Sequence, residues 1–273
     1  MTLENRHLSW TMLDVLKAAG YRIDILSNQN RSGWADSPVN MIYASADSLH
    51  FMHDKPFDAE CYDGVMLPYV DDWIKSVKHN EVRLLVLHLM GSHINWKDRV
   101  PTEFDTGLET DGYPSSVNDY DATICYTDYV LGQILDELSA MTRPAYLIYI
   151  SDHGTVCDYG KERRHPLTRK NSAYEVPFLV WSNSAFCYSR PKLMERLKIV
   201  QHKPLQLDRL HYGMLEIMGV DFKGCFDSEN LLSPNFRQVP RTMNQGALPY
   251  IKFTDDVSSE NIVPVSSEKA IEP

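Results

Sequence analysis

Two short apolar runs, each followed at once by polar residues that can bind metal ions or phosphate, constrain the fold of this chain most. Residues 84–89 lead into Met-Gly-Ser-His at residues 90–93, and residues 145–150 lead into Ser-Asp-His-Gly at residues 151–154. Near-continuous apolar runs of this length are typical of parallel strands that are covered on both faces. The sequence therefore predicts an α/β fold, a mostly parallel sheet with helices on both faces, whose site lies at the carboxyl ends of the strands.

The remaining periodicity alternates helices with strands. We expect helices at residues 10–19, 63–77, 118–138 and 205–218, and further strands at residues 21–26 and 176–181. Gly20 and Gly219 follow two of these helices, where a glycine commonly ends a helix. Residues 91–116 lack periodicity and are expected to form a long loop that covers a substrate. Residues 241–273 are polar and weakly patterned, which predicts an extension or a solvated tail.

Charge and composition exclude several classes of protein. The net charge is -10 and the basic residues form no concentrated stripe, so nucleic acid is not an expected partner. No stretch approaches the roughly 18 consecutive apolar residues that span a bilayer, and the polar start of the chain has no signal-peptide core. The five cysteines include no Cys-x-x-Cys pair, so neither a thiolate zinc site nor a complete disulfide framework is predicted.

Asp152 and His153 are the strongest candidates for metal ligands. Adjacent side chains of a strand point in opposite directions, so both can bind one ion only where the backbone leaves regular strand geometry. Gly154 is predicted to supply that conformational freedom. Taken alone, the same four residues also fit an ordinary turn with a hydrogen-bonded Asp and His.

Three further histidines lie near these runs. His93 and His165, together with the Asp-His pair, form a set of ligands suited to zinc or a similar divalent ion. Each also has a structural interpretation, because His93 can stabilise a turn and His165 lies in a cluster of charged residues. His88 lies inside an apolar run and is expected to be a neutral core histidine that is hydrogen-bonded to the backbone.

The chain resembles the carboxyl-terminal part of the lipid A phosphoethanolamine transferases, within the sulfatase and alkaline phosphatase superfamily. The resemblance extends from about residue 10 to about residue 240, in the order expected for the family. The segments that carry it are residues 13–21, 60–63, 86–93, 118–121, 126–131, 151–154 and 176–181. The order and spacing of so many segments is more specific than any single motif.

The resemblance implies a fold, an activity and roles for four residues. In that family the Asp-His pair binds zinc, which implies that Asp152 and His153 are metal ligands, and His93 and His165 are similar to the histidines that contact the phosphoryl group. The family transfers phosphoethanolamine from phosphatidylethanolamine to lipopolysaccharide, on lipid A or core sugar, through a phospho-threonine. The family also implies a location at the periplasmic face of the inner membrane.

The chain departs from the family pattern at its start. The first strand, the nucleophile helix, the first acidic zinc ligand and the nucleophilic threonine of the family lie before the position that corresponds to Met1, and Thr155 stands where the family usually has glutamate. Residues 1–240 are therefore expected to be a partial sulfatase-like catalytic domain that is inactive alone, either as a truncated gene product or with its other half as a separate chain. The alternatives are a sulfatase or phosphodiesterase-type hydrolase, and a non-catalytic binding module or gene remnant.

Overall fold

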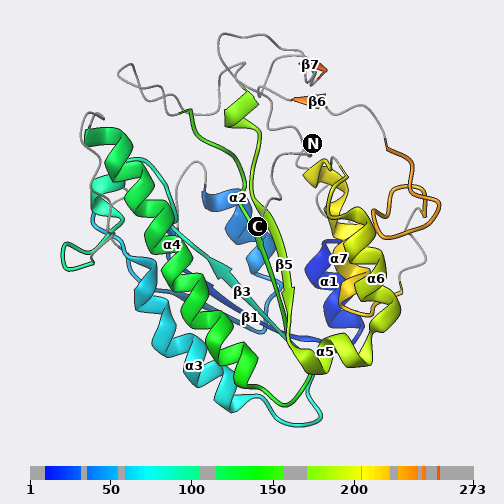
Figure 1. Ribbon diagram of the computed structural model, residues 1–273. Helices are drawn as coiled ribbons and strands as arrows, with labels where there is room; N and C mark the ends of the chain where they lie inside the picture. The colour runs from blue at the N-terminus through cyan, green and yellow to red at the C-terminus, as the bar shows by residue number, and fades with distance from the viewer. Residues whose placement is uncertain are drawn as a thin grey trace. The chain divides into compact units, whose positions relative to one another are not determined.

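The computed structural model describes most of the chain between residues 10 and 252 (Figure 1). The described ranges are residues 10–31, 36–54, 59–104, 115–156, 171–203, 205–221, 227–238, 242–243 and 251–252. Contacts divide the chain into two compact units, Met1–Met141 and Thr142–Pro273, and each is described by itself. Among the described residues, no helix has both the length and the apolar character that crossing a membrane requires.

The first unit is built on a parallel sheet. Strands β1 (Arg22–Ser27), β2 (Ser48–Phe51) and β3 (Arg83–His88) pair in the order β2-β1-β3, and both pairings are parallel. The central strand is the most buried of the three, as expected for a strand that is covered on both faces. The predicted strands at residues 21–26 and 84–89 are confirmed, whereas β2 was not predicted.

The α-helices in the described part of this unit are α1 (Met12–Ala18), α2 (Asp36–Tyr43), α3 (Leu67–Ser76) and α4 (Ser115–Ala140). A capping box between Thr11 and Asp14 begins α1, and Gly20, with a φ of 89°, follows its end. Helices α3 and α4 pack side by side (Figure 1). The helix predicted at residues 63–77 is instead a 3₁₀ helix, Asp63–Met66, followed by α3, because Pro68 has no amide hydrogen for a continuous helix.

The second unit begins with an antiparallel pair of strands. Strand β4 (Tyr146–Ile150) pairs with β5 (Phe178–Ser182), so the parallel arrangement expected from sequence holds only for the sheet of the first unit. Three helices follow: α5 (Ser184–Ser189), α6 (Pro191–Val200) and α7 (Leu210–Ile217). Of the predicted tail, the structure describes only the short pair β6 (Thr242–Met243) and β7 (Ile251–Lys252), so the boundary at residue 240 stays a prediction.

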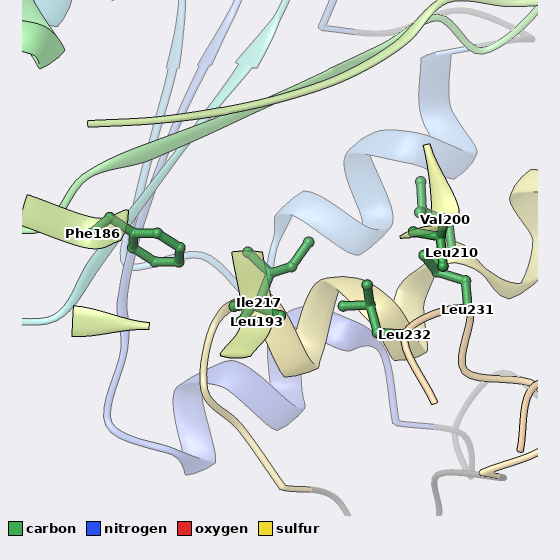
Figure 2. Packing of buried hydrophobic residues seen from close by; sticks show 7 residues of the cluster. All are labelled: Phe186, Leu193, Val200, Leu210, Ile217, Leu231 and Leu232. Carbon is green, nitrogen blue, oxygen red and sulfur yellow. The ribbon is translucent and has the colours of Figure 1, made fainter. Parts of the chain in front are cut away.

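A cluster of buried apolar side chains holds the helices of the second unit together (Figure 2). Leu193 and Val200 lie seven residues apart on α6, and Leu210 and Ile217 lie seven residues apart on α7, so each helix directs one face into the cluster. The other members are Phe186, Leu231 and Leu232. Truncating a leucine in such a cluster to alanine costs about 2–5 kcal/mol.

Candidate metal and phosphate site

The loop that follows β3 is fixed by one buried carboxylate. Asp63 is only 4% exposed, and its Oδ1 accepts hydrogen bonds from the backbone amide of Met90 and from Nδ2 of Asn28, both at 2.8 Å. Its Oδ2 accepts from the backbone amide of Gly91, also at 2.8 Å. Gly91 adopts a φ of 55°, in the left-handed region that favours glycine. The backbone therefore turns sharply between β3 and His93.

Two further contacts hold the same turn from other elements. The hydroxyl of Thr123 in α4 lies 2.7 Å from Oγ of Ser92, and Nε1 of the buried Trp96 donates to the Ser92 carbonyl at 3.0 Å. The amide of His93 lies 3.3 Å from the Met90 carbonyl, which closes the turn. The half-buried His93 therefore lies on a short loop that several hydrogen bonds hold in place.

In the second unit, the loop after β4 brings Asp152 and His153 together. Nδ1 of His153 lies 2.8 Å from the carbonyl oxygen of Gly154. Because a carbonyl only accepts, this contact selects the tautomer with the proton on Nδ1, in which Nε2 carries the lone pair. Nε2 lies 3.8 Å from Oδ2 of Asp152, whose side chain is 87% exposed, while that of His153 is 33% exposed.

This geometry fits one zinc ion between the two side chains. Zinc binds nitrogen and carboxylate oxygen at about 2.0–2.2 Å, so one ion can reach two atoms that lie 3.8 Å apart. A carbonyl on the second ring nitrogen is also the usual outer contact of a zinc-bound histidine. Within the described ranges, no group of three or more His, Cys, Asp or Glu side chains is arranged to hold a metal ion.

Gly154 has a different role from the predicted one. It does not adopt a positive φ, so conformational freedom is not what the position requires. A Cβ atom here would collide with the carbonyl oxygen of Ser172 and would lie 2.8 Å from that of Glu175. The amide of Gly154 donates to the Ala173 carbonyl at 3.0 Å. The glycine is needed because residues 172–175 pass directly against it.

The four predicted site residues do not all lie in one described part of the structure. Asp152 and His153 share one loop of the second unit, whereas His93 belongs to the first unit. His165 lies outside the described residues. The roles of all four stay predictions. His88 is half-buried and its Nδ1 lies 3.3 Å from the Ser27 hydroxyl, so the contact is to a side chain and not to the backbone as predicted.

The part that Asp63 and Asn28 play in holding the loop after β3 was not predicted from sequence. Asp63 lies in one of the segments that carry the family resemblance, residues 60–63, and that position was the available signal. Its hydrogen-bond donors lie 27, 28 and 35 residues away in sequence, so no local pattern reveals them. Likewise, nothing in the sequence pairs Sγ of Cys61 with Nε2 of His53, which lie 3.0 Å apart.

The parallel sheet and the polar loops that follow β3 and β4 define an α/β protein of the kind that keeps its chemistry at strand ends. A more specific assignment comes from comparison with known families. The sequence model of the Sulfatase family matches residues 5–220, so the chain belongs to the sulfatase family.

Curated relatives confirm the resemblance to the phosphoethanolamine transferases. Phosphoethanolamine transferase EptC of Escherichia coli (strain K12) is 24% identical over 258 residues, which cover 89% of this chain and 43% of the relative. Phosphoethanolamine transferase EptA of Helicobacter pylori is 32% identical over 175 residues, which cover 59% of this chain and 32% of the relative. The chain therefore spans less than half the length of these relatives.

Solved structures establish the fold. The C-terminal periplasmic domain of EptC from Escherichia coli matches with a TM-score of 0.77 at 21% identity, over 90% of this chain and 71% of that domain. The same domain in complex with Zn matches with a TM-score of 0.75 at 20% identity, over 89% and 71%. A protein of the alkaline phosphatase superfamily from Vibrio parahaemolyticus matches with a TM-score of 0.51 at 16% identity, over 86% and 54%. The chain therefore shares the fold of these structures.

Proposed function

We propose that this chain forms part of a zinc-dependent phosphoethanolamine transferase that acts on lipopolysaccharide at the periplasmic face of the inner membrane. The donor is phosphatidylethanolamine, and the acceptor is lipid A or core sugar. The observation that carries the proposal is the pairing of Asp152 and His153, with the His153 ring oriented by the Gly154 carbonyl. Related phosphoethanolamine transferases match most of the chain, and the EptC domain has been crystallised with Zn.

Each candidate residue has a chemical role in this proposal. Asp152 and His153 would hold zinc, which supplies a Lewis acid that polarises a phosphate oxygen. His93 and His165 would contact the phosphoryl group through ring nitrogens, and they would orient it and balance its negative charge. The rigid turn at residues 90–93 limits the directions in which the His93 ring can point. This favours a role for His93 in positioning the phosphoryl group.

We expect the chain alone to bind zinc weakly and to lack transferase activity. Catalytic zinc sites normally use three protein ligands, whereas the proposal assigns two, Asp152 and His153. The chain also spans only 43% of EptC of Escherichia coli (strain K12), so the activity of the whole enzyme is proposed for a longer assembly.

Calorimetric titration of the full chain with zinc tests the metal site. We expect one zinc ion per chain, with affinity at least tenfold weaker in Asp152→Ala and in His153→Ala, since each removes one of two ligands. His202→Ala is the matched control, because His202 is an exposed histidine of the same unit that is hydrogen-bonded to Gln201. Unchanged affinity in Asp152→Ala and His153→Ala would refute the assigned site.

A lipid assay tests the reaction class. The chain is mixed with the amino-terminal half of a related transferase, fluorescent phosphatidylethanolamine and lipopolysaccharide, and the modified acceptor is detected by mass spectrometry. Transfer that disappears in His153→Ala supports the proposal. Release of free phosphoethanolamine without transfer, or cleavage of an aryl sulfate, would instead assign the chain to the hydrolases of the superfamily.

A further inference from the structure

We propose that Asp63 is a positioning residue for His93, because its carboxylate fixes the turn that carries this histidine. The proposal rests on the function proposed above, in which His93 contacts the phosphoryl group. Asp63 acts through the backbone of Met90 and Gly91, the first two residues of the turn.

Asp63 joins the ends of two neighbouring strands. Strands β1 and β3 pair so that Ser27 is opposite His88, and the amide of Asn28 donates to the His88 carbonyl at 2.8 Å. The Asn28 side chain then reaches Oδ1 of Asp63, which also accepts from Met90. The carboxylate thus ties the residue after β1 to the first residues after β3, at the carboxyl edge where the site of an α/β protein lies.

Only a carboxylate can accept all three hydrogen bonds. The donors are two backbone N–H groups and one side-chain NH₂ group, and none of them can accept in return. In Asp63→Asn, the amide has a single oxygen, so its NH₂ group must face at least one donor. Because the site is buried, water does not replace the missing acceptor, and the backbone of the turn must move.

The surroundings agree with an acceptor whose position is strictly defined. Burial raises the pKa of Asp63, and hydrogen bonds from Met90, Asn28 and Gly91 and the positive charge of Arg99 offset only part of that rise. Arg99 is itself buried and donates to the carbonyls of Ala59 and Ile94. A buried acid with this number of donors is held in one orientation, and it transmits that orientation to the turn.

Asp24 provides a matched control within the same unit. It is as buried as Asp63, at 5% exposed, and its carboxylate is also hydrogen-bonded on both oxygens. Its donors are the side chains of Arg22, Trp73 and Arg83, none of which belongs to the turn at residues 90–93. Asp24→Asn therefore perturbs a buried acid of the same unit without removing a hydrogen bond to the turn.

The test uses the imidazole NMR signals of His93 in the full chain, assigned by their loss in His93→Gln. In Asp63→Asn we expect these signals to shift, and the affinity for O-phosphoethanolamine in the presence of zinc to fall about tenfold or more. In Asp24→Asn we expect lower thermal stability but unchanged His93 signals and unchanged affinity. Unshifted His93 signals in a folded Asp63→Asn variant would overturn the proposal.

A second variant keeps the test decisive if Asp63→Asn does not fold. Asn28→Ala removes one of the three donors and leaves the carboxylate in place, so we expect a smaller shift of the His93 signals. The absence of any shift in Asn28→Ala would then count against Asp63 as a positioning residue. The His93 signals are recorded without ligand, so failure of the wild-type chain to bind O-phosphoethanolamine refutes the proposed function separately.

Discussion

The ion pair between Asp24 of β1 and Arg83 of β3 allows a quantitative prediction. Nη2 of Arg83 lies 2.6 Å from Oδ2 of Asp24, both side chains are buried, and Nε1 of Trp73 donates to the same oxygen at 2.8 Å. Removing one partner of such a pair leaves an uncompensated buried charge, which costs about 3–5 kcal/mol. We therefore expect Arg83→Met to destabilise the first unit by about 3 kcal/mol or more.

Amide hydrogen exchange at Ile25 measures this change locally. Ile25 is fully buried in β1, and because the chain divides into two units, a probe inside the first unit is preferable to a global melting curve. A loss of about 3 kcal/mol speeds exchange at this amide by about 100-fold. Asp24→Asn should act similarly, and the double variant should lose less than the sum of the two single variants.

The stability that the pair of Asp24 and Arg83 contributes also depends on pH. Burial raises the pKa of Asp24, but hydrogen bonds from Arg83 and Trp73 and the charges of Arg83 and Arg22 outweigh it, so the pKa in the folded state is lowered. The stability that ionised Asp24 contributes is thus fully present above the unfolded pKa of about 3.9 and is lost as the pH falls through the folded pKa. The difference between the wild type and Asp24→Asn should shrink below about pH 4. Additive effects, or less than fivefold faster exchange in both single variants, would refute this account.

Three further predictions concern the second unit. Gly154→Ala should destabilise the loop and weaken zinc binding at least tenfold, measured by calorimetry, because the added methyl group collides with the Ser172 carbonyl. Asn183→Ala should lower the free energy of unfolding by about 1–2 kcal/mol in urea titration, since its side chain accepts from the Phe186 amide and caps α5. Removing zinc with a chelator should lower the melting temperature of the wild-type chain but leave that of Asp152→Ala unchanged, by the mass action of a ligand that binds only the folded state.

The strands that carry the candidate site could be predicted from sequence because each is an apolar run with a polar end. Both β3 and β4 were found in this way, and the family resemblance is confirmed by the comparisons. Helix α6 was missed although only four of its ten residues are charged, and it is stabilised by contacts of Leu193 and Val200 with the apolar cluster. Strand β2 has only four residues, too few for a periodicity to be detected.

The details of the loops could not be predicted, since they depend on contacts between segments far apart in sequence. The role of Gly154 comes from residues 172–175, and that of Asp63 from the ends of β1 and β3. A split helix at residues 63–76 was in principle readable from Pro68, although the apolar pattern continues through it. The sequence therefore predicted where these loops lie, but it did not predict the long-range contacts that determine their conformation.

The hydrogen bonds of Asp63 connect the residues that follow β1 and β3. The turn at residues 90–93 therefore depends on the register in which these two strands pair. A slip of β3 by one residue would turn its side chains to the opposite face of the sheet and carry Met90 and Gly91 away from the carboxylate. Such a misaligned chain would leave the buried carboxyl group of Asp63 without its donors. The correct register of β3 and the turn that carries His93 therefore stabilise each other.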